Sequence, residues 1–216
     1  MATLANIVPK KVALIIGSTR VIRAGPEVVS FVKKTLLTSP STTAPEIEIV
    51  DIADFNLPVF NEKTLPAMVP AQGQFEHEHS KKWSAAIAPF DGYIFVAPEY
   101  NFGLPGGLKN AIDYLYNEWI GKPVLIVTYG IFGGSSSSDQ LQKTLNGMKL
   151  RVVETRPQLA YAGPGMADMF AATGTGKVGP NSIELWEKEG KEPLLKGFTE
   201  LVELLETPVP EPAKTE

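Results

Sequence analysis

The sequence predicts an α/β protein built on a parallel sheet, and two observations lead to that prediction. Residues 11–17 (KVALIIG) and 123–129 (PVLIVTY) are almost continuously apolar, which is typical of strands that are buried on both faces. Such runs alternate along the chain with segments in which apolar residues recur at helical spacing. An alternation of strands and helices favours a parallel sheet whose crossover connections are right-handed.

Five segments have the pattern of strands. The second, residues 46–52 (EIEIVDI), alternates between polar and apolar residues and is expected nearer an edge of the sheet. The fifth, residues 151–159, contains Pro157, which has no N–H to donate, so the end of this strand is expected at an edge. The complete predicted set is 11–17, 46–52, 93–97, 123–129 and 151–159.

Helices are predicted between these strands and after the last one. Pro26 suits the first turn of a helix that ends near residues 38–40. A helix predicted over residues 106–119 places its apolar residues on one face, namely Leu108, Ile112, Leu115 and Trp119. Further helices are predicted over residues 80–87, around the apolar face Leu141, Leu145 and Met148, and over residues 182–206. Residues 54–70 and 160–181 are predicted to be irregular.

The predicted strand order indicates where in the fold a ligand crevice lies. Five parallel strands suit a flavodoxin-like three-layer sandwich with the strand order 2-1-3-4-5. In that order the ligand crevice lies at the carboxyl ends of strands one and three, so the loops after strands one, three and four meet there. We expect a single domain over residues 1–206 and a Pro-rich, disordered tail over residues 207–216.

Composition excludes several classes of function. The 216 residues include no cysteine, which rules out disulfides, thiolate metal sites and cysteine nucleophiles. The net charge of −4 and the lack of a dense Lys/Arg run argue against nucleic acid, and no apolar stretch is long enough for a membrane helix. The only two histidines, His77 and His79, are too few to predict a metal site. We expect a cytoplasmic protein.

The first loop of interest, residues 17–25, joins a strand to a helix. A helix N-terminus presents N–H groups without partners and a partial positive charge, and both favour a phosphate. Ser18 and Thr19 add hydroxyl donors, and Arg20 and Arg23 can each hold phosphate oxygens through two N–H groups. The alternative is a surface loop whose arginines make ordinary salt bridges.

Two further loops offer flat surfaces and backbone donors. Pro98 and Pro105 stiffen the second loop, in which Tyr100 and Phe102 can stack on a ring and Asn101 can donate or accept hydrogen bonds. The third loop, residues 129–135, has three glycines that bring backbone N–H groups close to a ligand. The alternatives are a stiff packing loop and a mobile turn.

Three stretches together resemble the NADPH-dependent FMN reductase family, which includes flavodoxin-like quinone and azo-dye reductases. They are GSTRVIRAG at residues 17–25, PEYNFGLPGGLKNAIDYLYNEW at 98–119 and GKPVLIVTYGIFGG at 121–134. The resemblance spans residues 11–159. It implies FMN as cofactor, with its phosphate at Ser18, Arg20 and Arg23. It also implies contacts of the ribityl chain and ring with Pro98, Glu99, Tyr100, Asn101, Phe102, Tyr129, Gly130, Phe132 and Gly133.

The resemblance also implies a reaction. NADPH (or NADH) would give a hydride to FMN, and a quinone, an azo compound or free flavin would then be reduced by a ping-pong route. The flavin carries this chemistry, so no catalytic side chain is assigned. We expect backbone N–H groups of the third loop to stabilise the negative charge of the reduced flavin. A homodimer is also implied, with Trp119 and the loop after Phe60 as candidate interface positions.

Two alternatives of other classes remain open. One is a non-enzymatic, one-electron FMN carrier like a flavodoxin, and the other is a catalytically idle interaction module that keeps the fold. Arg20, Arg23 and the mild net charge favour the reductase over the carrier.

Overall fold

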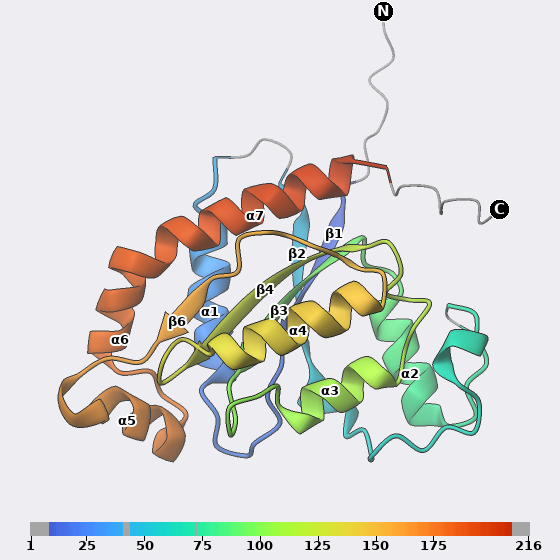
Figure 1. Cartoon of the computed structure of the whole chain (residues 1–216), viewed down its shortest axis with the longest axis horizontal. Helices are drawn as coiled ribbons and strands as arrows, with labels where there is room; N and C mark the ends of the chain where they lie inside the picture. The colour runs from blue at the N-terminus through green and yellow to red at the C-terminus, as the bar shows by residue number, and fades with distance from the viewer. Residues whose placement is uncertain (1–8, 41–43, 72, 209–216) are drawn as a thin grey trace, which may run out of the picture.

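A parallel six-stranded sheet forms the centre of the protein (Figure 1). The structure is a computed structural model that describes residues 9–40, 44–71 and 73–208. The strands run in the order β2-β1-β3-β4-β5, and β6 also pairs with β4. Their bounds are β1 (Lys11–Ile16), β2 (Glu46–Asp51), β3 (Gly92–Pro98), β4 (Pro123–Gly130), β5 (Arg151–Val152) and β6 (Gln158–Ala160). The predicted α/β class and the flavodoxin-like strand order are confirmed.

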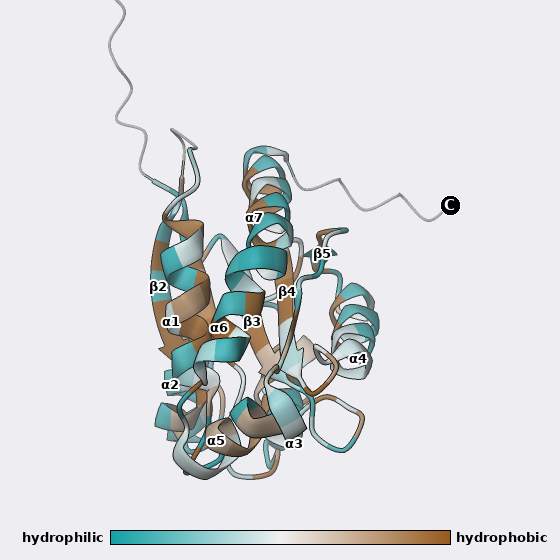
Figure 2. Cartoon of the chain, turned by 90° about the vertical axis from the view of Figure 1, so that its left-hand side faces the viewer, coloured by the Kyte–Doolittle hydropathy of each residue, from teal (hydrophilic) through white to brown (hydrophobic). Residues whose placement is uncertain are grey.

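The apolar runs form strands that are covered on both faces. In β1, Val12 and Leu14 belong to one apolar core, and Ala13 and Ile15 belong to the core on the opposite face. This alternation follows from the two-residue period of a strand. Figure 2 shows the strands as an apolar layer between helices that are polar on their outer surfaces.

Helices cover the two faces of the sheet. One face packs against α1 (Gly25–Leu36), α6 (Pro180–Leu185) and α7 (Lys191–Glu206), and the other against α2 (Glu78–Ile87), α3 (Gly106–Asp113) and α4 (Ser135–Gly147). Short 3₁₀ turns lie at η1 (Ile52–Phe55), η2 (Pro66–Met68) and η3 (Pro164–Met166). In Figure 1, α5 (Ala167–Thr175) lies at the lower left, at the end of the sheet toward which β6 runs.

The predicted strand over residues 151–159 is two short strands, so its continuity was wrongly predicted. Between β5 and β6 the Thr155 N–H and hydroxyl donate to Glu200 of α7, which draws this segment away from β4. The carbonyl of Pro157 then accepts from Thr128 N at 3.0 Å and β6 begins. Pro157 thus lies where the edge strand is interrupted.

The prediction of irregular structure over residues 160–181 was also wrong. This segment contains η3, α5 and the start of α6. The helix predicted over residues 182–206 is not continuous, because a π-helical turn, η4 (Trp186–Gly190), lies between α6 and α7. Gly163 and Gly165 lie just before α5, and Gly176 lies just after it. These glycines made the segment look like a loop in the sequence, although they lie outside the helix.

Trp119 lies in the core, so its prediction as an interface residue was wrong. Helix α3 ends at Asp113, six residues earlier than the end of the predicted helix (119 − 113 = 6), and the chain then turns inward. The Trp119 ring packs edge-on against Tyr93 with ring centroids 4.8 Å apart and has no exposed surface. Residues 209–216 of the predicted tail lie outside the described residues.

Candidate functional site

The loop between β1 and α1 surrounds an uncapped helix N-terminus. No side chain caps the first turn of α1, and Pro26 stands there, so several backbone N–H groups remain without a partner in the helix. Ser18 lies beneath this turn, and its buried Oγ makes no hydrogen bond with a described residue. A Cβ atom on Gly25 would lie 2.3 Å from Ser18 Oγ, so glycine is needed at this position. The loop can therefore hold an anion.

The two arginines of this loop have different roles. Arg23 donates to the Ser18 carbonyl at 2.6 Å and to both carboxylate oxygens of Asp51, at 2.9 and 2.5 Å. These bonds join the loop to the end of β2. Arg20 is exposed and makes one bond, of 3.3 Å, to the carbonyl of Thr173. Arg20 is therefore the arginine that remains available to a ligand.

The loop after β3 is a tight two-residue hairpin turn. Tyr100 and Gly103 exchange two backbone hydrogen bonds, of 3.1 and 3.0 Å. The two residues between them, Asn101 and Phe102, have φ of 49° and 61°. Positive φ is unfavourable for phenylalanine, and such strain clusters at functional sites. The turn leaves the Phe102 side chain 78% exposed.

The loop after β4 is bonded to the loop after β3. The Glu99 carboxylate accepts from Ser136 N at 2.9 Å, at the start of α4, and Glu99 N donates to the Tyr129 carbonyl. Gly133 and Gly134 have φ of 79° and 83°, which only glycine adopts without strain. The carboxylate of Glu99 therefore organises the loops, while Phe132 is 75% exposed at their rim.

A cavity of about 150 Å³ lies where the three loops meet. Seven of the sequence-predicted residues line it: Arg20, Arg23, Pro98, Glu99, Tyr100, Tyr129 and Gly130. Ser18, Asn101, Phe102, Phe132 and Gly133 lie in the same loops without lining it. Thr19 lines a different cavity, of about 260 Å³, beside Gly107 and Asn110 of α3.

Six residues that line the cavity were not among the predicted site residues. Ala24 and Ile131 lie in two of the predicted loops, whereas Tyr161, just after β6, and Met169, Ala172 and Thr173 of α5 lie outside all three. The signal that was overlooked is the glycine-free segment from Met166 to Thr173, which is long enough for two helical turns.

Three tyrosines give the cavity neutral hydroxyl groups. Burial raises the pKa values of Tyr129, Tyr161 and Tyr100, and for Tyr100 the nearby Arg20 opposes that rise. The Tyr129 hydroxyl lies close to Ser18 Oγ but outside hydrogen-bond geometry. Because these phenols keep their protons at neutral pH, they act as hydrogen-bond donors and not as bases.

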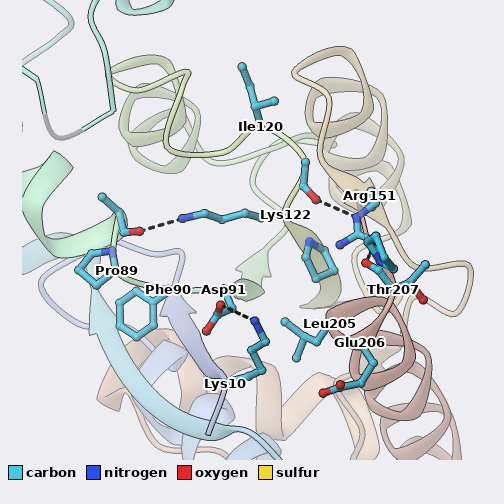
Figure 3. A pocket seen from close by; sticks show the side chains of 14 residues that line it. Lys10, Pro89, Phe90, Asp91, Ile120, Lys122, Arg151, Leu205, Glu206 and Thr207 are labelled. Carbon is cyan, nitrogen blue, oxygen red and sulfur yellow. Dashed lines mark hydrogen bonds and ion pairs between the residues drawn. The ribbon is translucent and has the colours of Figure 1, made fainter. Parts of the chain in front are cut away.

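A second, larger cavity lies at the opposite end of the sheet and contains none of the predicted residues. Its volume is about 540 Å³, and Lys10, Lys122 and Arg151 line it at the amino ends of the strands (Figure 3). Lys122 Nζ donates to the Ala88 carbonyl at 2.9 Å and to the Tyr93 hydroxyl at 3.0 Å. Burial lowers the pKa of Lys122 to about 8. Topology nevertheless favours the carboxyl ends of the strands as the ligand site.

Two kinds of feature are absent from the described residues. Within residues 9–40, 44–71 and 73–208, no helix has the length and apolarity to span a membrane. The same part of the chain has no cluster of three or more His, Cys, Asp or Glu side chains suited to a metal ion.

Comparisons with known proteins agree with the fold. The sequence profile of a family described as "NADPH-dependent FMN reductase" matches residues 10–162. The chain is 50% identical over 200 residues to an NAD(P)H-dependent FMN reductase of Nectria sp., covering 92% of this chain and 98% of that protein. It is 38% identical over 103 residues to a quinone reductase of Escherichia coli, covering 45% of this chain and 49% of that protein. A solved flavoenzyme NAD(P)H:(acceptor) oxidoreductase from Paracoccus denitrificans is similar in fold, with a TM-score of 0.62 and 24% identity over 91% of this chain and 97% of that one.

Proposed function

Because the chain belongs to the NADPH-dependent FMN reductase family, we propose that the loops after β1, β3 and β4 bind FMN and present it to NAD(P)H and to a small acceptor. The chain is an oxidoreductase whose cofactors are FMN and NAD(P)H. The observation that carries the assignment of the site is the meeting of these three loops at one cavity beside the uncapped N-terminus of α1.

The residues at the start of α1 fit the phosphate of FMN. Backbone N–H groups of the first turn, the buried Ser18 Oγ without a partner and the exposed Arg20 are all donors, and an anion would satisfy them together. Arg23 serves this group indirectly, because its bonds to Asp51 and to the Ser18 carbonyl hold the loop in shape.

The other two loops fit a flat ring. Pro98, Tyr100 and Tyr129 offer apolar surface with hydroxyl groups at its edge. Among the described residues, the N–H groups of Ile131 and Phe132 have no backbone acceptor, and they lie at the turn before α4. These N–H groups are the donors we assign to the ring edge, where they would stabilise negative charge.

The protein's part in the reaction is to bind and to position. When bound, FMN would supply the redox chemistry, namely acceptance of a hydride from NAD(P)H and transfer of two electrons to an acceptor. Tyr100, Tyr129 and Tyr161 keep their protons and supply hydrogen bonds without acting as bases. Phe102 and Phe132 place apolar surface at the rim, where the nicotinamide and a quinone or azo compound would approach in turn. Because both substrates would reach the site through the same rim, we propose that they bind one after the other, in a ping-pong order.

A homodimer is part of the proposal. Exposed apolar side chains occur in the loop after Phe60, at Leu65 and Met68, and at the rim of the site, at Phe102, Phe132 and Phe170. A second copy of the chain could cover such a surface. Sedimentation at micromolar concentration tests this, and a monomer at all concentrations would refute it.

Anaerobic spectroscopy tests the function. We expect the purified protein to bind FMN, to lose the visible flavin band when NADPH is added, and to regain it with a quinone. A bound flavin that NADPH does not bleach would favour the one-electron carrier. Absence of FMN binding would favour an idle module that keeps the fold.

A further inference from the structure

The cavity at the amino ends of the strands has room for a small molecule. Its volume of about 540 Å³ lies within the roughly 300–1,000 Å³ that is usual for such pockets. Lys10, Asp91 and Lys122 line it just before β1, β3 and β4 (Figure 3). Arg151, at the start of β5, and Leu205, in the last turn of α7, complete the ring of elements around it. None of the residues assigned to FMN lies here.

Lys122 is a partly buried cation without an anionic partner in the described part of the chain. Its Nζ donates to the Ala88 carbonyl at 2.9 Å and to the Tyr93 hydroxyl at 3.0 Å, and both acceptors are neutral. Within residues 9–40, 44–71 and 73–208 it forms no ion pair. Burial lowers the pKa of Lys122 to about 8, against the opposing charges of Asp91 and Glu118. An ammonium group has three N–H donors, so one of them remains for a ligand.

Arg151 has the same character. Its Nε donates to the Gly121 carbonyl at 2.7 Å, and its Nη1 donates to the Thr207 carbonyl at 3.1 Å. Both acceptors are neutral, and among the described residues Arg151 also forms no ion pair. Burial lowers the pKa of Arg151 as well. A guanidinium group has five N–H donors, so three of them remain to hold the oxygens of an anion.

The charges that line the cavity leave it positive. Lys10, Lys122 and Arg151 stand against two carboxylates, so the cavity has one positive charge in excess (3 − 2 = +1). Of those carboxylates, Asp91 is paired with Lys10 at 3.1 Å, and Glu206 is exposed. Withdrawing a cation from water without an opposite charge is unfavourable. An anion in the cavity would offset that cost for Lys122 and Arg151 together.

The cavity also offers apolar surface. Phe90 and Leu205 line it and are buried in the fold, and Ile120 lines it with an exposed side chain. Pro89 and Pro123 add two rings (Figure 3). A ligand that matches both kinds of surface has an anionic group and an apolar body.

We propose that this cavity is a second ligand site, which binds a small organic anion. The anionic oxygens would be held by Lys122 and Arg151, and the apolar body would lie against Phe90 and Ile120. A carboxylate and a phosphate ester share this chemistry, and competition between them tells which is bound. The proposal is independent of the proposed function, because the site lies at the opposite end of the sheet from the loops assigned to FMN.

Labelling of lysines by pyridoxal 5′-phosphate tests the site, with FMN present in excess to fill its own site. The aldehyde condenses with a neutral amine and releases water, and borohydride then gives a hydride to the imine, which leaves a stable secondary amine. Because a low pKa alone speeds this reaction, pyridoxal without phosphate is the control reagent. We expect the ratio of phosphorylated to unphosphorylated label to be about tenfold higher at Lys122 than at the exposed Lys143. Equal ratios, measured by peptide mass mapping, would overturn the proposal.

Competition in the wild-type protein is the second test. Protection of Lys122 by inorganic phosphate would indicate a phosphate ester, and protection by benzoate would indicate a carboxylate. Protection by neither would refute the site. Arg151→Gln should bring the ratio at Lys122 close to that at Lys143, whereas Arg156→Gln, which removes an arginine paired with Asp139 outside the cavity, should not. If Arg151→Gln does not fold, the competition experiment still decides, because it needs no variant.

Discussion

Arg20 and Arg23 are three residues apart, but the structure predicts that replacing them has different consequences. Arg23 is held by Asp51 and by the Ser18 carbonyl, and its side chain is 15% exposed. Arg23→Gln would leave the Asp51 carboxylate, 17% exposed, without its cation. Arg20 has one long bond to a carbonyl and is otherwise free for a ligand. We therefore expect Arg23→Gln to lower stability and Arg20→Gln to lower FMN affinity.

The magnitudes follow from burial and charge. Removing one partner of a buried ion pair lowers stability by roughly 3–5 kcal/mol, and the partial exposure of this pair reduces the expected loss to about 2 kcal/mol. For a chain of this size that loss lowers Tm by about 4–8 °C. A charged hydrogen bond to phosphate contributes roughly 1.5–3 kcal/mol, so Arg20→Gln should raise the Kd for FMN by roughly 10- to 150-fold.

The assay is a thermal melt of each apoprotein together with a titration by FMN. Arg20→Gln should melt like wild type and bind FMN weakly. Arg23→Gln should melt early and, at a temperature where it is folded, bind FMN with an affinity within a few-fold of wild type. The reasoning is refuted if Arg23→Gln melts like wild type and loses FMN affinity. That result would mean that Arg23 gives up its bonds to Asp51 and binds the phosphate itself.

Three further predictions concern the remaining parts of the chain. Burial lowers the pKa of Lys122 to about 8 from its ordinary 10.5, so between these pH values the unfolded chain binds more protons and stability rises with pH. Urea unfolding measures this effect. Between pH 7 and pH 10, the free energy of unfolding of wild type should rise by about 2 kcal/mol relative to that of Lys122→Met, after allowance for partial exposure. A difference between the two proteins that does not change with pH would contradict this. Glu99→Gln removes a negative charge at the start of α4 and should lower the free energy of unfolding by about 0.5–1 kcal/mol in the same assay. The control is Glu203→Gln, at an exposed position. Equal losses in both variants would argue that the Glu99 carboxylate does not stabilise the start of α4. Phe102→Asn should raise Tm, because asparagine tolerates positive φ better than phenylalanine does. The same change should raise the KM for a quinone, because the exposed aromatic ring at the rim of the site is removed. An unchanged KM would show that Phe102 does not contact the acceptor.

The sheet and the place of the site could be predicted from the sequence because both depend on local signals. Apolar runs without polar interruption give strands buried on both faces, and the strand order then brings the loops after β1, β3 and β4 together. The glycines at 133 and 134 reveal a turn that needs positive φ, as expected of a glycine-rich loop.

The remaining features depend on contacts between distant residues. The partner of Arg23 is Asp51, at the end of a neighbouring strand, and periodicity carries no information about that pair. Trp119 continues the apolar face of α3 in the sequence, but the helix ends at Asp113 and the ring turns into the core. Helix α5 is short and has glycines close to both ends, so the segment resembles a loop in composition, and the bond from Arg20 to the Thr173 carbonyl joins residues that are far apart in the sequence.

The burial of all three tryptophans in the described structure has a practical consequence for spectroscopy. Trp83 and Trp119 belong to the core beneath α2, α3 and α4, whereas Trp186 belongs to the opposite core. Trp186 Nε1 donates to the Ala160 carbonyl at 2.6 Å, and its ring lies 6.2 Å from that of Tyr161, which lines the site. Indole emission from this chain should therefore be blue-shifted, and energy transfer from Trp186 to bound flavin would give an intrinsic optical signal of cofactor occupancy. Replacing Trp186 by phenylalanine would separate that signal from the emission of the other two rings.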